Sequence, residues 1–337
     1  MKTLISSLAL WVVLLALATP APAQLLINGA GATFPYPIYA KWFDEYRKIN
    51  PKAQINYQSI GSGGGIRQLQ AGTVDFGASD SPMTNEQLSQ ANGKVLHFPT
   101  VLGAVVTTYN VPGVKQELTF TPEALGGIFL GTITRWNDPE LARHNPGVRL
   151  PANNIVVVRR SDGSGTTFVW TDYLSKANAA WKSKVGAGNS VNWPVGLGAK
   201  GNEGVAGLVK QTPNAIGYVE LVYAIQNKMS YGKIRNAAGA FVKADLKGVT
   251  AAAASAVVPD DFRVSITNAP GKDAYPISSF TWLLVPAKIQ NAQKRKILTD
   301  FLRWMLTDGQ KLAQPLGYAP LPKAVVDKEL KAISLVQ

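Results

Sequence analysis

The chain has 337 residues, of which 46% are hydrophobic, and its formal net charge is +13. This length and apolar content are sufficient for two hydrophobic cores. The absence of cysteine excludes both a disulfide framework and a lipid-anchored cysteine. The 34 Lys and Arg residues are scattered rather than clustered, so we expect no nucleic-acid partner. The charge either attracts small anions or only aids solubility.

The N-terminal segment has the features of a secretory signal peptide. Lys2 precedes an apolar run over residues 8–18, and Ala21, Pro22 and Ala23 form an A-x-A cleavage pattern. A membrane anchor is the alternative, but the run is short for a span of roughly 20 residues and lacks a basic stop-transfer flank. We therefore expect export, with cleavage after Ala23.

The first part of the chain alternates between predicted helices and strands. Apolar residues spaced three and four apart predict an amphipathic helix over residues 35–49. Residues 54–60 alternate as a strand does, and the glycine-rich residues 61–65 predict a loop. A helix over residues 66–71 is then expected to end at Gly72.

A short strand is expected over residues 74–78, just before Asp80. The nearly continuous apolar run over residues 98–111 is typical of a buried central strand, here one that crosses between domains. Thr121 and Asp138 each precede a proline and a glutamate, so helices are expected to begin there.

The second half of the chain continues this alternation, which is typical of an α/β fold with mostly parallel sheets. Two long apolar strands flank the central block, so the chain is expected to leave one domain, build another and return. We expect strands over residues 156–160, 215–219 and 277–285 and helices over 166–177, 203–210 and 295–306, and we make no assignment for 236–255.

The most informative segment covers residues 156–167, where an apolar strand delivers Arg160, Asp162 and a Ser-Gly-Thr turn to one place. The glycine-rich turn leaves backbone N–H groups free, and the segment after it presents a helix N-terminus. Helix N-termini and backbone N–H groups of this kind bind phosphate or sulfate. The segment therefore predicts a site for a small anion.

Arg160 follows a run of valines, and its planar guanidinium can bind two anion oxygens at once. An ion pair with Asp162 is the structural alternative. Arg160 can fill both roles at once, because Asp162 can orient the guanidinium while the anion binds the remaining donors. Strand alternation places Arg159 on the opposite face, where we expect a structural role.

Three loops share one pattern, a glycine-rich turn that bears a hydroxyl group and leads directly into a helix. Each alone is typical of an ordinary helix N-cap. Together, in an α/β protein, they favour several helix N-termini that converge on one cleft at the carboxyl ends of the strands. The loops contain Thr33 and Phe34, then Ser62 and Gly63, and then Ser164, Gly165 and Thr166.

Asp80 is unusual in this group, because a carboxylate repels an anion unless a proton lies between them. Phosphate carries such a proton near neutral pH and sulfate does not, so an acceptor-only carboxylate would select phosphate. The alternative is that Asp80 caps the turn at residues 81–83 or the helix after it. Spacing alone slightly favours the capping role.

The sequence contains no strong signature of an enzyme. His97 and His144 are the only histidines, and no metal-ligand spacing occurs. Ser164 does not lie in a G-x-S-x-G elbow, and neither glycine loop continues into Lys-Ser or Lys-Thr as a Walker A loop does. We therefore expect no catalysis, no metal and no cofactor, and both histidines are expected to be packing or surface residues.

Taken together, the motifs resemble those of the periplasmic phosphate-binding proteins of high-affinity phosphate ABC importers, the PstS family. Several motifs in the same order across nearly the whole mature chain make this resemblance specific, whereas a single Gly-Ser-Gly-Thr would not. The motifs are residues 29–35, 60–62, 74–80, 98–101, 159–166, 193–194, 201–202 and 215–220.

The resemblance implies an α/β, two-lobed periplasmic-binding-protein fold of class II. Each lobe has a mostly parallel sheet flanked by helices, and the ligand lies in the cleft between the lobes. By the same resemblance Asp80 accepts the phosphate proton, Arg160 supplies paired cationic donors and Asp162 holds the arginine. This favours the phosphate role of Asp80 over the capping role. The other implied phosphate ligands are Thr33, Phe34, Ser62, Ser164, Gly165 and Thr166.

The resemblance also predicts how the chain divides. After the signal peptide, residues 1–23, lobe I contains residues 24–107 and 275–337, and lobe II contains residues 108–274. The lobes are expected to close over one dehydrated phosphate.

Two segments depart from the family pattern. Where relatives often have Ser-Ser-Gly, this chain has Ser62-Gly63-Gly64, which keeps the implied ligand and affects only loop stiffness and surrounding bonds. Residues 236–255 match poorly and are expected to lie away from the cleft.

The protein implied by the resemblance is a monomer that binds inorganic phosphate selectively in the periplasm and delivers it to the membrane permease subunits of an ABC transporter. Two alternatives remain open. One is a binding protein for another oxyanion, such as sulfate or molybdate. The other is a secreted phosphate-scavenging or phosphatase-like protein built on the same fold.

Overall fold

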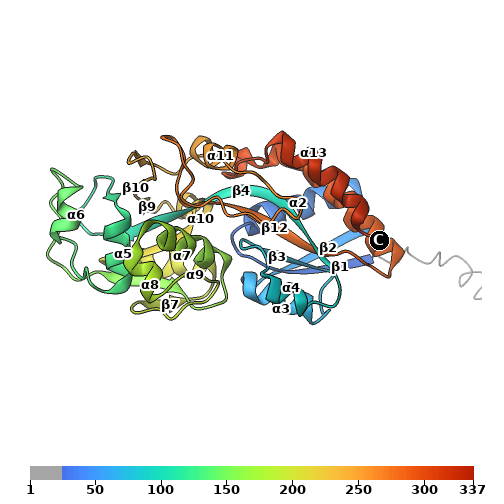
Figure 1. Ribbon diagram of the computed structural model, residues 1–337, viewed down its shortest axis with the longest axis horizontal. Coiled ribbons are helices and arrows are strands. Elements are labelled where there is room, and N and C mark those ends of the chain that lie inside the picture. The colour runs from blue at the N-terminus through green and yellow to red at the C-terminus, as the bar shows by residue number, and fades with distance from the viewer. Residues whose placement is uncertain (1–24) are drawn as a thin grey trace, which may run out of the picture.

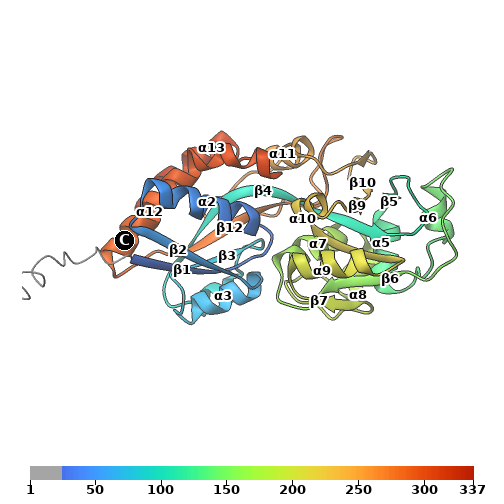
Figure 2. The same cartoon turned by 180° about the vertical axis from the view of Figure 1, so that it is seen from behind.

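The structure, a computed structural model, describes residues 25–337, and the predicted signal peptide over residues 1–23 lies outside this range. The described chain forms two lobes that lie side by side along the longest axis, as Figures 1 and 2 show from opposite sides. The C-terminus lies in the same lobe as the first described strand (Figure 1). Among the helices of residues 25–337, none has the length and apolar character needed to cross a membrane.

The first lobe is a sheet covered by helices on both sides. Its elements are β1 (Leu25–Gly31), α2 (Tyr36–Ile49), β2 (Ala53–Ser59), α3 (Ser62–Gln70), β3 (Phe76–Ser79), α4 (Asn85–Ser89), the first part of β4 (Val95–Asn110), β12 (Ser278–Pro286), α12 (Ala292–Leu306), η1 (Gly309–Leu312), η2 (Gln314–Leu316), α13 (Lys323–Ala332) and η3 (Ile333–Leu335). The strand order is β2-β1-β3-β12-β4. β1 is parallel to β2 and β3, whereas β12 is antiparallel to β3 and β4.

The second lobe continues the same sheet from β4. Its elements are β5 (Thr119–Phe120), α5 (Pro122–Leu130), α6 (Pro139–Arg143), β6 (Val156–Arg160), α7 (Gly165–Ala177), α8 (Ala179–Lys184), β7 (Leu197–Ala199), α9 (Gly201–Gln211), β8 (Ala215–Glu220), α10 (Leu221–Gln226), β9 (Ser230–Tyr231), β10 (Lys233–Arg235), β11 (Phe241–Val242) and α11 (Leu246–Ala254). The strand order is β4-β8-β6-β7, β9 also pairs with β4, and β11-β10-β5 form a small separate sheet.

A single long strand, β4, belongs to both lobes. Residues 95–104 pair with β12, and residues 105–110 pair with β8, both in antiparallel orientation. Residues 97–109 are all buried, as a continuous apolar run requires. The predicted buried strand that crosses between domains is therefore confirmed.

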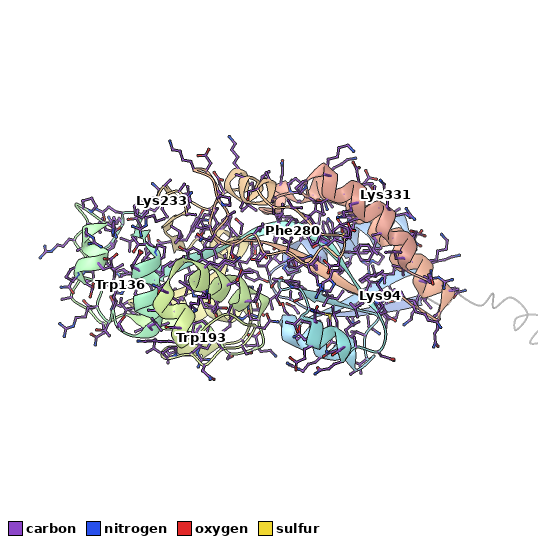
Figure 3. The ribbon with its side chains drawn as sticks, viewed as in Figure 1. Lys94, Trp136, Trp193, Lys233, Phe280 and Lys331 are labelled. Carbon is purple, nitrogen blue, oxygen red and sulfur yellow. The ribbon has the colours of Figure 1, made fainter. Side chains whose placement is uncertain are left out.

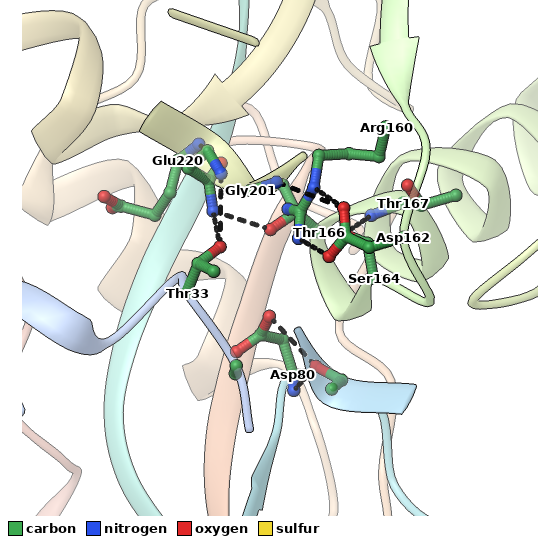
Figure 4. A network of polar contacts seen from close by, with 12 residues as sticks. Thr33, Asp80, Arg160, Asp162, Ser164, Thr166, Thr167, Gly201 and Glu220 are labelled. Carbon is green, nitrogen blue, oxygen red and sulfur yellow. Dashed lines mark hydrogen bonds and ion pairs between the residues drawn. The ribbon is translucent and has the colours of Figure 1, made fainter. Parts of the chain in front are cut away.

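The predicted α/β class is confirmed as well. The parallel groups β2-β1-β3 and β8-β6-β7 form the two outer parts of the sheet, and the antiparallel pairs lie between them, where the lobes meet. Because β1, β3 and β6 each end toward the junction of the lobes, the loops that follow these strands meet there (Figure 4).

Helix starts follow the capping residues that the sequence contains. The Thr121 side chain accepts a hydrogen bond from the Ala124 N–H at 3.0 Å, and Asp138 accepts one from Glu140 at 2.9 Å. The first N–H groups of a helix have no acceptor within the helix, so such side chains fix its first residue. The helix starts predicted at Thr121 and Asp138 are confirmed.

The glycine-rich segment after β2 differs from the prediction. The sequence predicts a loop over residues 61–65, but α3 already begins at Ser62. A Cβ atom on Gly65 would lie 2.5 Å from the Cα of Gly31, so this glycine lets the first turn of α3 pack directly on the backbone of β1. Gly61, with a φ of 88°, turns the chain into the helix without strain. Here the glycines allow close packing rather than flexibility.

Residues 236–255, which the sequence leaves unassigned, contain β11 and α11. The Asp245 side chain caps α11 by accepting from the Gly248 N–H at 2.7 Å. Asn236 is buried, and its Nδ2 donates to three backbone carbonyls in residues 271–274. Because α11 packs against β4 and β12, this segment supports the junction of the lobes from outside.

Aromatic side chains fill the core of the second lobe and fix the end of β6. Tyr218 stacks on Trp170 and on Trp193, with ring centroids 5.1 and 5.9 Å apart, and Figure 3 shows Trp193 in this lobe. The Tyr218 hydroxyl accepts from the backbone N–H of Arg160 at 3.2 Å and shares a hydrogen bond of 2.6 Å with Thr167. The core thus positions the segment on which the predicted anion site depends.

Candidate functional site

The polar side chains that follow β1, β3 and β6 meet between the two lobes (Figure 4). They come from four separate parts of the chain, and each lies at or just after the end of a strand or at the start of a helix. All of the sequence-predicted ligands whose side chains carry polar groups are at most 2% exposed: Thr33, Ser62, Asp80, Arg160, Ser164 and Thr166.

Asp80 lies directly after β3 and is 1% exposed. Its Oδ1 accepts a hydrogen bond of 2.8 Å from the Thr281 hydroxyl, and its backbone N–H donates to Ser62 Oγ at 3.2 Å. Burial raises the pKa of Asp80 to about 7, although Thr281, the positive charge of Arg160 and Ser62 oppose this rise. A carboxyl group in this state exchanges its proton near neutral pH.

The capping role considered for Asp80 does not match the geometry. In the turn after β3, Ser79 makes the local bonds, because its hydroxyl donates to the Ser81 carbonyl and accepts from the Ser81 N–H. The next helix, α4, is capped by Thr84. The Asp80 carboxylate instead points to the junction of the lobes (Figure 4).

Arg160 lies at the end of β6 and is paired with Asp162. Its Nε donates to Asp162 Oδ1 at 2.8 Å, and its Nη2 donates to Oδ2 at 2.5 Å. Burial alone would raise the pKa of Asp162, but the hydrogen bonds and charge of Arg160 bring it below the usual value. The Arg160 Nη1 atom is buried and makes no hydrogen bond with the residues described. The guanidinium is thus held on one edge and has a donor free on the other.

The first turn of α7 faces the same place. Ser164 is the N-cap residue, and its Oγ accepts from the Thr167 N–H at 3.0 Å, so its own proton is free to be donated. Gly165 and Thr166 are the first residues of α7, where backbone N–H groups have no acceptor within the helix. This turn therefore offers several donors to a negative charge.

The two lobes touch at these residues, so the structure is a closed form. A Cβ atom on Gly165 would lie 2.6 Å from Asp80 Oδ2 and would also collide with the Ser62 hydroxyl. The Gly63 N–H donates to the Gly163 carbonyl at 2.8 Å across the junction. Gly165 therefore approaches Asp80 and Ser62 of the other lobe at a distance that leaves no room for a side chain, and Gly163 packs tightly against Gly63.

Thr33 and Phe34 complete the contribution of the first lobe. The Tyr223 hydroxyl donates to the Thr33 carbonyl at 2.6 Å, and the Tyr318 hydroxyl donates to the Phe34 carbonyl at 2.7 Å. Thr33 Oγ1 also accepts from Asn202 Nδ2 at 2.8 Å. The turn after β1 is thus fixed from both lobes.

Sequence reasoning did not assign a role to two residues that contact this cluster. Thr281 lies on the predicted strand over residues 277–285, where a threonine among apolar residues gives no signal of a site. Asn202 falls within a motif that resembles the family, but its contacts with Thr33 and Thr166 could not be read from spacing.

Arg159 and both histidines lie apart from these contacts. Arg159 Nη1 donates to the carbonyl of its neighbour Arg160. His97 is buried, accepts from the Met83 N–H through Nε2, and its pKa is lowered to about 4 by burial. His144 packs against Phe241. Within residues 25–337 no group of three or more His, Cys, Asp or Glu side chains has a metal-binding arrangement.

A two-lobed α/β fold whose lobes close over a buried polar cluster is the fold of periplasmic-binding proteins, and the family model described as a PBP superfamily domain matches residues 18–309. Within this superfamily, the chain belongs to the family of phosphate-binding protein PstS. It is 47% identical over 309 residues to PstS of Xylella fastidiosa strain Temecula1, which covers 91% of this chain and 84% of the relative. It is 46% identical over 305 residues to PstS of Pasteurella multocida, covering 90% and 88%.

A solved structure shows the same fold at lower identity. It is that of a high affinity periplasmic phosphate-binding protein, PfluDING, bound with phosphate. The TM-score is 0.73 at 22% sequence identity, over 90% of this chain and 93% of the other.

Proposed function

We propose that this protein binds inorganic phosphate between its lobes and delivers it to the membrane permease of a phosphate ABC importer. The PstS relatives are named for phosphate binding and are similar over about nine-tenths of this chain. The observation that carries the proposal is the convergence of Asp80 and Arg160. One is a buried acceptor and the other a buried donor, and they come from opposite lobes.

Phosphate matches the donors and the acceptor of this cluster. Arg160 supplies the positive charge, and the hydroxyl and N–H groups around it donate to phosphate oxygens. Asp80 accepts the proton that phosphate carries near neutral pH. The proposed ligands are Thr33, Phe34, Ser62, Asp80, Arg160, Ser164, Gly165 and Thr166, with Asp162 holding the guanidinium.

Asp80 makes the proposed site selective. Sulfate is fully ionised at neutral pH and would place an oxygen against the carboxylate without a proton between them. A buried site built around one hydrogen bond strongly rejects an analogue that lacks it, because a buried group is then left unpaired. The Asp80 carboxylate therefore favours phosphate over sulfate or molybdate.

Binding is proposed to proceed by lobe closure. Residues 24–107 and 275–337 would move as one body and residues 108–274 as the other, with bending at the segments that connect them. Phosphate would stabilise the closed form because both lobes contact it. A monomer that is exported, with cleavage after Ala23, would present this closed form to the permease at the outer face of the membrane.

The proposed role is binding and not catalysis. The PstS relatives carry the names of phosphate-binding proteins. A turnover assay with a phosphate monoester, with and without divalent metal, separates the two roles, and release of phosphate above the blank would overturn this part of the proposal.

The proposal is tested by isothermal titration of ligand-stripped protein at neutral pH. Phosphate is expected to bind with one site per chain, and sulfate is expected to bind far more weakly. No heat of binding with phosphate, or equal affinity for both anions, would contradict the proposed function.

A further inference from the structure

Asn202 connects both lobes through its side chain. It lies in the first turn of α9 and is fully buried. Its Nδ2 donates to Thr33 Oγ1 of the first lobe at 2.8 Å and to Thr166 Oγ1 of the second lobe at 3.1 Å. Both hydroxyl groups belong to the proposed phosphate ligands, so one amide group controls two of them.

The orientation of this amide is determined by its third contact. Asn202 Oδ1 accepts a hydrogen bond of 2.9 Å from the backbone N–H of Glu220, a group that can only donate. The oxygen of the amide must therefore face β8, and the NH₂ group must face Thr33 and Thr166. The alternative amide orientation would set two donors against each other.

The position of α9 is itself tied to Arg160. The Gly201 N–H donates to Asp162 Oδ1 at 3.1 Å, and Asp162 holds the Arg160 guanidinium. The backbone N–H of Asn202 also lies 3.3 Å from Thr33 Oγ1. The carboxylate of Asp162 thus holds both the Arg160 guanidinium and the start of the helix that carries Asn202.

Accepting from Asn202 restricts what the two threonines can do. A hydroxyl group has one proton and two acceptor positions, and an acceptor position on each oxygen is used by an N–H of Asn202. Each hydroxyl proton must therefore be donated to a group other than the amide of Asn202.

We infer that Asn202 is a positioning residue that makes the Thr33 and Thr166 hydroxyls act as donors to the bound anion. This inference rests on the proposed phosphate binding. With both hydroxyls directed as donors, Asp80 is left as the acceptor for the phosphate proton. Asn202 therefore contributes to selectivity without touching the ligand.

The test compares phosphate affinities of Asn202→Asp and Asn202→Ala by isothermal titration. The aspartate has nearly the same shape but only accepts, so it would draw both threonine protons away from the ligand. We expect a loss of affinity on the order of 100-fold or more for Asn202→Asp, since two bonds to a charged group are lost. For Asn202→Ala, which leaves the hydroxyls free to rotate, we expect a loss of roughly tenfold.

A matched background separates hydroxyl direction from packing and charge. In Thr33→Val with Thr166→Val, both hydroxyls are removed while the side-chain shape is kept. In this background, Asn202→Ala should lower the phosphate affinity by less than about twofold. The fold-loss of affinity caused by Asn202→Asp should be at least about tenfold smaller than the loss it causes when the threonines are present. Equal losses in the two backgrounds would overturn the inference.

Two controls make the outcome of this test unambiguous. Each variant is first checked for a cooperative thermal transition, and if Asn202→Asp does not fold, the cycle with Asn202→Ala decides alone. The unsubstituted protein is titrated in parallel. If it fails to bind phosphate, the proposed function fails and the inference with it, whereas normal binding with an unaffected Asn202→Ala contradicts only the role of Asn202.

Discussion

At the scale of single residues, the contrast between Asp80 and Asp162 shows how surroundings decide what a carboxylate does. Both are mostly buried, but Asp162 is bound by two nitrogens of Arg160, which keeps it ionised. Asp80 has a hydroxyl partner and a more distant positive charge, and burial raises its pKa to about 7. One carboxylate therefore serves as a fixed counter-charge and the other as a group that can share a proton.

Asp80→Asn should reduce the preference for phosphate over sulfate. The amide has a donor where the carboxylate has only lone pairs, so the penalty against a fully ionised anion is removed. We expect the ratio of the two affinities to fall on the order of 100-fold or more, measured by competitive titration. Asp44→Asn, on the exposed face of α2, removes the same charge and should leave the ratio unchanged. An unchanged ratio in Asp80→Asn would remove its proposed role.

Gly165→Ala should impair closure, because the new methyl group would meet Asp80 and Ser62 of the opposite lobe. We expect phosphate affinity to fall on the order of 10- to 100-fold, as overpacking of a close contact does. Gly207→Ala is the matched control. It lies in α9 with no atom within 4 Å of the added carbon, so binding should be retained and the helix stabilised by about 0.5–1 kcal/mol. Normal affinity in Gly165→Ala would show that the lobes do not need this contact to bind.

At the scale of helices and strands, an irregularity in one ladder helps place a residue of the site. The pairing between β12 and β4 shifts register between Thr281 and Trp282. Thr100 has no partner residue in the pairing at this shift, and its side-chain hydroxyl donates to the Thr281 carbonyl at 3.1 Å. Thr281 directs its hydroxyl to Asp80 from this point. A β-bulge of this kind commonly re-aims a side chain next to a binding site.

Thr281→Val should weaken phosphate binding without changing the shape of the strand. The hydrogen bond from Thr281 lowers the pKa of Asp80, so its removal leaves more of the carboxyl protonated near neutral pH and unable to accept. We expect a loss of about 2 kcal/mol in the free energy of binding at pH 7, and a smaller loss at pH 9. A loss that does not depend on pH would point to packing instead.

Most of these elements could be predicted from the sequence because local rules govern them. The apolar run of β4 and the caps at Thr121 and Asp138 produce their structures as expected. The loop predicted over residues 61–65 was wrong, because composition cannot tell a glycine needed for close packing from one needed for freedom. Residues 236–255 could not be assigned, because single hydrogen bonds hold this segment and such bonds leave no periodic pattern in the sequence. Asn236 bonds to a distant part of the backbone, and Asp245 caps the helix that follows it.

The candidate site could be predicted only in part. The loops with Ser164 and Arg160 carry a local pattern that indicates an anion, and the family motifs add Asp80. Thr281 and Asn202 could not be found, because each is a single polar residue whose partners are 201 and 169 positions away in the chain. Such contacts are fixed by the three-dimensional arrangement of strands, not by local composition.

At the scale of the whole molecule, the junction of the lobes holds two buried carboxyl groups whose pKa values are raised. Asp80 is one, and Glu220 is the other, because burial raises its pKa well above the usual value. Glu220 Oε2 accepts from the Val222 N–H, but its Oε1 makes no hydrogen bond with the residues described. If the proposed lobe opening exposes these groups to water, closure of the ligand-free protein would bury carboxyl groups that ionise in the open form.

Closure of the ligand-free protein should become less favourable as pH rises. An exposed aspartate has a pKa near 3.9, so between about pH 4 and 7 the closed form binds more protons than the open form. The stabilisation is complete below pH 4 and is lost as pH passes through about 7. Small-angle scattering from pH 4.5 to 8.5 should show a growing radius of gyration. Asp80→Asn should reduce this growth, and a radius that is constant or shrinks with pH would contradict the expectation.

The strand shared by the two lobes has a consequence for how the chain acquires its structure. Because β4 pairs with β12 through residues 95–104 and with β8 through residues 105–110, neither half of the sheet is complete without segments from distant parts of the chain. Ser278 to Pro286 must reach a strand that lies about 180 residues earlier, and such long loops form slowly. The two lobes thus share one continuous sheet, and the first of them cannot be completed until nearly the whole chain is present.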